Sequence, residues 1–185
     1  MPVLGGPSVK PYQPDGLWEE SGWDGYTQDH GDALYRRSMY TFAKRTVPPP
    51  VMLTFDAPSR EFCIARREVT QTPLQALVLL NEPGFVEAAR VLAARVARET
   101  PETGAQLTHV FRMLTGRHPL EAEQALLQQA YDEQHAWFAT RADDAKAYVS
   151  AGESPAESTL DPVAHAALTA VVQAIMNHED AQVKS

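Results

Sequence analysis

The sequence predicts an all-α fold, an irregular bundle of about five to six helices with a long N-terminal arm rich in proline and aromatic residues. Three observations lead to this prediction. From residue 72 onward, apolar residues recur at the spacing of amphipathic helices. Two of these segments begin with a capping side chain followed by proline, which is a helix start signal. No alternating run of apolar and polar residues is long enough to form a substantial sheet.

Residues 1–71 are predicted to form an extended arm that packs on a helical body of residues 72–185, the two together making one domain. Eight of the 14 prolines and nine of the 15 aromatic residues precede residue 63. Proline fixes φ and lacks an amide proton, so residues 48–50, three consecutive prolines, favour extended backbone. Aromatic rings can anchor such an arm because each one buries a large apolar area.

The helical body begins with a predicted capping box at residues 72–75, in which Thr72 and Gln75 satisfy backbone N–H groups. Asn81 and Pro83 are predicted to end that helix and to start the next one. In this second helix an apolar stripe is expected to face inward, with Glu87 and Arg90 facing solvent. The stripe comprises Phe85, Ala88, Ala89, Leu92 and Val96.

Further helices are predicted in the rest of the body. Residues 107–114 carry apolar side chains at helical spacing, and Gly116 stands where a left-handed C-terminal residue is expected. A longer helix starts at Pro119 or Leu120 and has acidic residues in its first turn. A shorter helix covers residues 143–150. After a polar linker, the last helix starts at residues 161–162, where aspartate precedes proline.

Composition and charge limit the classes of function. The chain has 185 residues, of which 44% are hydrophobic and 22% charged, as in globular proteins with a core. The net charge of −8 argues against nucleic acid or an anionic membrane as the main partner. No membrane span is expected because no run of 18 apolar residues occurs, and the first residues lack the pattern of a secretory signal. The single cysteine, Cys63, excludes an internal disulfide and is expected to be a buried, inert thiol.

The strongest chemical signal is a group of cations around Asp56 in a proline-rich segment. Guanidinium groups match carboxylate, sulfate or phosphate in shape, so convergence of these side chains would form a site for an anion or an acidic sugar. The alternative is a structural ion network in which Asp56, Glu61 and Glu68 pair with the arginines. The cations are Lys44, Arg45, Arg60, Arg66 and Arg67.

Two other groups of side chains have competing interpretations. Four aromatic residues of the arm could stack on sugar rings, but rings in an irregular arm more often hold it in place; they are Trp18, Trp23, Tyr35 and Tyr40. No two of the six histidines stand at the helical spacing of a metal pair, so no metal site is expected. His109 and His165 are predicted to lie at the solvent or at a boundary of the core.

The chain resembles the planctomycete C-terminal domain of unknown function 1553. The specific part of the resemblance is residues 34–90, including Leu34-Tyr35-Arg36-Arg37-Ser38-Met39-Tyr40, Lys44-Arg45-Thr46-Val47-Pro48-Pro49-Pro50 and Thr72-Pro73-Leu74-Gln75. The resemblance implies that the chain corresponds to the later part of the domain and that its partner is the rest of a larger polypeptide or another protein. It also implies a periplasmic or cell-envelope location and a connection with polysaccharides. Haem is expected only in the cytochrome modules that accompany the family, so no cofactor is expected in this chain.

Two hypotheses about function follow from these residues. The first is a binding or scaffold module that positions a larger envelope protein against a partner or a polysaccharide. The second is a fragment of an enzyme that acts on acidic or sulfated polysaccharide, with Lys44 and the arginines holding the anion and Asp56 or Glu61 transferring a proton. The resemblance supplies no catalytic residues. Convergence of the cations on one cleft that also holds a carboxylate distinguishes the two hypotheses.

Overall fold

The computed structural model of the chain describes residues 3–19, 25–58, 63–66 and 69–182. Across these residues it contains eight α-helices and no strand, so the predicted all-α class is confirmed. Extended backbone pairs there in two isolated bridges, Val9 with Thr41 and Lys44 with Val47. None of the described helices combines the length and the apolar character needed to cross a membrane.

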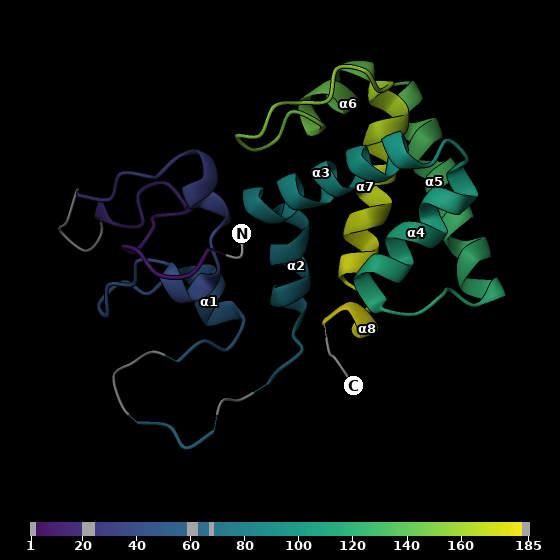
Figure 1. Cartoon of the computed structure of the whole chain (residues 1–185). Helices are drawn as coiled ribbons and strands as arrows, with labels where there is room; N and C mark the ends of the chain where they lie inside the picture. Colours follow the sequence, from purple (N-terminus) through teal and green to yellow (C-terminus); the bar gives the residue numbers. More distant parts are fainter. Residues whose placement is uncertain (1–2, 20–24, 59–62, 67–68, 183–185) are drawn as a thin grey trace. The chain divides into compact units, whose positions relative to one another are not determined.

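The chain divides into two compact units, Met1–Gln75 and Ala76–Ser185, and the division falls within helix α2 (Pro73–Asn81). The first unit is mostly irregular backbone, drawn in purple and blue in Figure 1. Its short helices include two 3-10 helices, η2 (Gly31–Tyr35) and η3 (Ser38–Tyr40), and helix α1 (Pro50–Thr54). Each unit is therefore described by itself.

Paired backbone and stacked rings hold the irregular backbone of the first unit together. The amide of Val9 donates to the carbonyl of Tyr40 at 2.8 Å, and the amide of Phe42 donates to the carbonyl of Val9 at 2.7 Å. The buried ring of Trp18 stacks on Tyr26, with ring centroids 4.8 Å apart, and lies 6.0 Å from Phe42. Burial raises the pKa of Tyr26 to about 12. Aromatic burial thus orders an arm that has little secondary structure.

The second unit is a bundle in which helix α7 (Pro162–Met176) packs against five other helices. Figure 1 shows α7, in yellow, running through this bundle. The surrounding helices are α3 (Pro83–Glu99), α4 (Thr103–Thr115), α5 (Glu121–Ala139), α6 (Ala142–Tyr148) and α8 (Glu179–Gln182). Ten buried residues form the main core cluster, and they are Ala89, Ala93, Val96, Leu107, Val110, Phe111, Leu168, Val171, Val172 and Ile175.

The helix boundaries follow local capping chemistry, and the predicted capping box is confirmed. The amide of Thr72 donates to Gln75 Oε1 at 2.9 Å, and the amide of Gln75 donates to Thr72 Oγ1 at 3.3 Å. Helix α2 ends at Asn81, and α3 restarts at Pro83, as predicted. Gly116 has the expected left-handed conformation, with φ of 81°, at the end of α4.

Three predictions about burial are wrong. Glu87 and Arg90 were expected to face solvent, but each is only 1% exposed because both side chains bind backbone groups of a distant loop. His165 was expected at the solvent or a boundary but is 2% exposed, because it lies on the face of α7 turned toward α3. Cys63 was expected to be buried but is exposed, as are its described neighbours Ile64 and Arg66.

Candidate functional site

Two of the predicted cations border a hollow of about 270 Å³ in the first unit. Lys44 and Arg45 lie at the turn closed by the hydrogen bond from the Val47 amide to the Lys44 carbonyl, at 3.0 Å. The remaining lining is apolar, and consists of Ala43, Pro48, Pro49, Met52, Leu53, Ala57 and Pro58. This Lys44–Arg45 hollow therefore combines cationic groups with an apolar wall stiffened by proline.

The hollow is built from a turn followed directly by a short helix. Pro48 and Pro49 lead from the turn into α1, and Pro50 occupies the first position of α1, where its missing amide proton costs no hydrogen bond. Met52 and Leu53 of α1 then supply side chains to the wall. Arg45 is exposed, so its guanidinium is available to an anionic group in solution. Chemically, the hollow suits a ligand with an anionic group and an apolar surface.

Asp56 anchors the segment that follows α1. Its backbone is in the left-handed region, with φ of 57°, which aspartate tolerates better than most residues. Its carboxylate accepts hydrogen bonds from the Thr70 amide at 2.8 Å and from Thr70 Oγ1 at 2.9 and 3.0 Å. The buried Gln75 then donates to Thr70 Oγ1 at 3.2 Å and to the Thr54 carbonyl at 2.9 Å. Asp56 thus fastens the end of α1 to the start of α2.

The other predicted cations do not complete the site among the described residues. Arg66 is exposed and belongs, with the exposed Cys63, to the short described segment of residues 63–66. Arg60 and Arg67 lie outside the described residues, together with Glu61 and Glu68. The structure therefore brings together Lys44 and Arg45, and convergence of all five cations stays a prediction.

Of the four aromatic residues singled out in the arm, Trp18 and Tyr40 have packing contacts. Trp18 is buried in the stack with Tyr26. The guanidinium of Arg36 lies 3.8 Å from the ring centroid of Tyr40, whose hydroxyl accepts from the Gly5 amide at 2.8 Å. Tyr35 is 38% exposed, and Trp23 lies outside the described residues.

A charged cluster inside the second unit was missed by the sequence analysis. We call it the buried cluster; it consists of Glu87, Arg90 and the backbone of residues 151–155. Arg90 donates from Nε to the carbonyl of Ala151 at 3.1 Å, from Nη1 to that of Pro155 at 3.1 Å, and from Nη2 to that of Ser154 at 2.6 Å. Glu87 Oε1 accepts from the Ser154 amide and lies 3.7 Å from Arg90 Nη2. One ion pair thus fixes the backbone of a loop more than 60 residues further along the chain.

Gly152 lets the loop backbone approach this pair. A Cβ at residue 152 would lie 2.4 Å from Glu87 Cδ, closer than real Cβ atoms come to other heavy atoms. The residue also has φ of 88°, in the region that favours glycine. A side chain at this position would therefore strain the backbone and displace Glu87.

His165 lies against the same part of α3. Its Nε2 is 2.9 Å from the carbonyl oxygen of Arg90, which can only accept, so Nε2 carries the proton. Nδ1 is then the basic nitrogen, and it is buried with no hydrogen-bond partner. Burial lowers the pKa of His165, and the nearby charge of Arg90 lowers it further.

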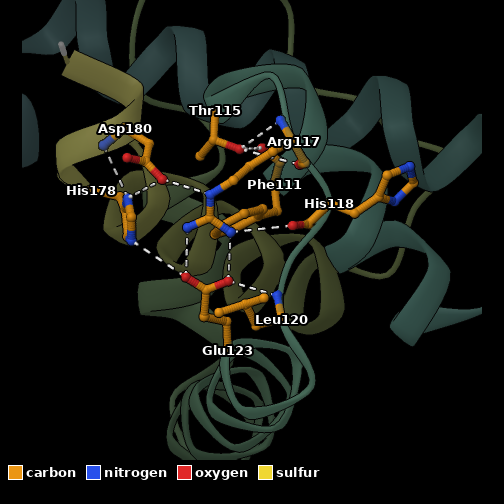
Figure 2. A network of polar contacts seen from close by, with 8 residues as sticks. All are labelled: Phe111, Thr115, Arg117, His118, Leu120, Glu123, His178 and Asp180. Carbon is orange, nitrogen blue, oxygen red and sulfur yellow. Dashed lines mark hydrogen bonds and ion pairs between the residues drawn. The ribbon is translucent and has the colours of Figure 1, made fainter. Parts of the chain in front are cut away.

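A second charged cluster lies at the end of the bundle where α4, α5 and α8 meet, as Figure 2 shows. We call it the surface cluster, and it consists of Arg117, Glu123, His178 and Asp180. Arg117 binds both oxygens of Glu123 at 2.7 Å and donates from Nε to Asp180 Oδ2 at 2.7 Å. Its guanidinium carbon also lies 4.9 Å from the ring centroid of Phe111. The cluster ties α8 to the turn between α4 and α5.

The electrostatics of the surface cluster match this structural role. Glu123 also accepts from the Leu120 amide at 2.7 Å, which caps α5. The bonds from Arg117 and from this amide lower the pKa of Glu123 to about 2. His178 lies 3.8 Å from Glu123 and 3.9 Å from Asp180. Arg117 thus holds both carboxylates, and the first turn of α5 also holds that of Glu123.

The sequence contained a signal for the buried cluster. Arg90 shares an i, i+4, i+7 stripe with Val86 and Ala93, both of which are buried. Charged residues within an apolar stripe are uncommon and indicate a paired, buried charge. The partner could not be found in this way, because it is backbone of a distant loop and carries no residue signature.

Comparison with known proteins places the chain in a family. A family model named PSD1, described as protein of unknown function (DUF1553), matches residues 2–131. The match includes the Lys44–Arg45 hollow and α3 and ends within α5. No curated protein and no solved structure matches the chain. The chain belongs to the DUF1553 family, as the resemblance indicated.

Proposed function

We propose that this member of the DUF1553 family is a binding module that recognises an acidic carbohydrate at the Lys44–Arg45 hollow. The observation that carries the proposal is that Lys44 and Arg45 line the same hollow as three prolines and two residues of α1. The proposed ligand is a uronic or sulfated oligosaccharide belonging to a larger polysaccharide.

The chemistry of the hollow supports this ligand class. A sugar ring has an apolar face formed by its C–H groups, and this face suits the rings of Pro48 and Pro58 and the side chain of Met52. Arg45 offers a planar, two-pronged donor for a carboxylate or sulfate, while Lys44 adds a compact point charge. The prolines limit how much entropy binding removes, because their backbone is already fixed.

Binding is favoured over catalysis because of how Asp56 is used. The hypothesis of an enzyme fragment requires a carboxylate that is poised to exchange a proton beside the cations. The carboxylate of Asp56 instead accepts from the amide of Thr70 and, through both of its oxygens, from the hydroxyl of Thr70, and so fastens two segments of the first unit. A carboxylate occupied in this way supports an architectural role.

The test is calorimetric titration of the full chain with a panel of oligosaccharides. The panel contains uronic and sulfated oligomers and neutral oligomers of equal length. We expect binding of the acidic members only, with affinity that falls as salt concentration rises. Replacing Arg45 by alanine should weaken binding about tenfold, which corresponds to about 1.4 kcal/mol.

Arg37→Ala provides the matched control. Arg37 is an exposed arginine of the same unit and does not line the hollow. Arg37→Ala should leave the affinity for acidic oligosaccharides unchanged. Arg45→Lys should bind more tightly than Arg45→Ala and less tightly than the wild type, because lysine keeps the positive charge but lacks the two-pronged guanidinium donor. Absence of binding across the panel with folded protein, or equal losses in Arg37→Ala and Arg45→Ala, would contradict recognition at the hollow.

A further inference from the structure

His165 is connected through Arg90 to the loop of residues 151–160, so protonation of His165 can affect the contacts of this loop. This loop runs from the end of α6 to Asp161, the residue that caps α7, and His165 is in the first turns of α7. The imidazole donates to the backbone carbonyl of Arg90, whose side chain holds three carbonyls of the loop. One residue of α3 therefore contacts both the titratable ring and the loop.

The neutral ring fits this site and the charged ring does not. With Nε2 donating to the Arg90 carbonyl, a second proton would go to Nδ1. That atom is buried and has no acceptor, so a proton there would be an unsatisfied buried donor carrying charge. A buried charged group without a hydrogen-bond partner is strongly disfavoured, because it has lost its water and gained no acceptor in return.

The charges around the ring do not offset this cost. From α3, the guanidinium of Arg90 repels an imidazolium, and Glu87 is already engaged with Ser154 and Arg90. From the loop, Glu157 attracts it, but the carboxylate of Glu157 is bound to Arg98 and Thr159. On α7 itself, Asp161 accepts from the Ala164 amide as the helix cap.

We propose that His165 makes the buried cluster sensitive to acid, so that its protonation releases the loop of residues 151–160 while the rest of the bundle stays folded. Protonation requires Nδ1 to reach water, and the simplest opening separates the first turns of α7 from α3. That movement breaks the hydrogen bond from His165 to the Arg90 carbonyl. The side chain of Arg90 then releases the carbonyls of residues 151–155. This inference does not rest on the proposed function, since it concerns the other unit.

The direction of the effect follows from proton linkage. A buried neutral histidine binds fewer protons in the closed form than in the open form, so lower pH favours opening. The effect begins below the ordinary histidine pKa of about 6.5. From there the opening equilibrium should rise about tenfold for each pH unit, until the ring also titrates in the closed form.

The test is hydrogen exchange of the full chain between pH 7.5 and pH 5, corrected for the intrinsic effect of pH on exchange. The amide of Ser154, which Glu87 holds, should open about tenfold more for each unit below pH 6.5. Core amides of α4, such as Phe111, should keep their protection across the range. Parallel loss of protection in the loop and in α4 would mean global acid unfolding and would overturn the proposal.

Two variants separate His165 from the other histidines. His165→Gln keeps a donor able to reach the Arg90 carbonyl and cannot titrate, so loop opening should become independent of pH. His109→Gln changes a partly exposed histidine of α4 and should keep the dependence of the wild type. The proposal fails if His165→Gln retains the full dependence.

A measurement on the wild-type protein keeps the proposal testable if His165→Gln does not fold. Long-range nitrogen–proton NMR spectra report which ring nitrogen carries the proton. At pH 7.5 the proton should be on Nε2, and as pH falls the Arg90 Nε–H signal should exchange faster together with protonation of the His165 ring. A proton on Nδ1, or a protonated ring with an undisturbed Arg90 signal, would overturn it.

Discussion

The second unit contains two arginine–carboxylate clusters that differ mainly in burial. In the buried cluster, Arg90 and Glu87 have side chains that are 1% and 2% exposed, and both also bind backbone of residues 151–155. In the surface cluster, the side chain of Arg117 is 39% exposed and pairs with two carboxylates, those of Glu123 and Asp180. The surface cluster has more ion pairs, yet water can replace each of its contacts.

This difference shows that the number of ion pairs is a poor guide to their structural importance. Charges at the surface are solvated in the unfolded and the folded chain, so pairing them changes the free energy of unfolding little. Charges in the core have lost water and depend on their partners, so removing one partner leaves the other with no compensation. Arg90 and Arg117 allow this contrast to be measured within one small bundle.

The largest expected effect is that of Arg90→Leu. The substitution leaves Glu87 buried without its cation and three loop carbonyls without their donor. We expect unfolding to be easier by about 3–5 kcal/mol, the range for breaking a buried ion pair. Urea titration followed by circular dichroism measures this change.

Arg95→Leu is the control for Arg90→Leu. Arg95 lies on the same helix, and its exposed side chain pairs only at the surface, with Glu99 at 3.0 Å. It should cost less than about 1 kcal/mol. Combining Arg90→Leu with Glu87→Gln should cost less than the sum of the two changes, because no uncompensated carboxylate remains. Equal effects of Arg90→Leu and Arg95→Leu would show that burial does not distinguish the two kinds of pair.

The second-largest effect is expected for Gly152→Ala, which tests how closely the loop approaches Glu87. The new Cβ meets Glu87 Cδ at 2.4 Å, and the residue has a left-handed backbone. The left-handed backbone should lower the free energy of unfolding by about 1–2 kcal/mol. The overlap of the new Cβ with Glu87 should lower it by a further amount of about 1–3 kcal/mol. Thermal and urea unfolding give the total.

Gly116→Ala isolates the backbone part of that loss. Gly116 has nearly the same φ, 81°, but a Cβ there meets nothing within 4 Å. Its cost should therefore be the backbone part alone, about 1–2 kcal/mol. If Gly152→Ala and Gly116→Ala lower the free energy of unfolding by the same amount, residue 152 is not in close contact with Glu87.

The same contrast explains which parts of the fold could be predicted from sequence. The starts of α2, α3 and α7 were predictable because a capping side chain and a proline stand within three residues of each other. The left-handed Gly116 was predictable because glycine is the residue that most readily takes this conformation after the last turn of a helix. These signals are local, and the backbone groups they satisfy belong to the same helix turn.

The interior charges were not predictable because their partners are remote. Glu87 and Arg90 were assigned to the solvent face on the rule that charged residues lie outside, which fails when backbone 60 residues away supplies the partner. His165 was misplaced in the same way, since its partner is the carbonyl of Arg90. In the first unit, adjacency in sequence placed Lys44 and Arg45 together, whereas the bonds of Asp56 to Thr70 depend on a left-handed turn.

The smallest expected effect separates the two clusters by pH. Interaction with Arg117 and the Leu120 amide lowers the pKa of Glu123 to about 2, below its ordinary value of 4.5. A carboxyl with a lowered pKa stabilises the folded state above its unfolded pKa, and this stabilisation is lost as pH falls from about 4.5 to about 2. His165 acts at higher pH, because it destabilises the closed form as pH falls below about 6.5. Glu123→Gln should therefore flatten the stability profile only at the acid end, and His165→Gln only nearer neutrality. Urea midpoints measured from pH 7.5 to pH 2.5 test this separation, and a profile that Glu123→Gln flattens near pH 6 would contradict it.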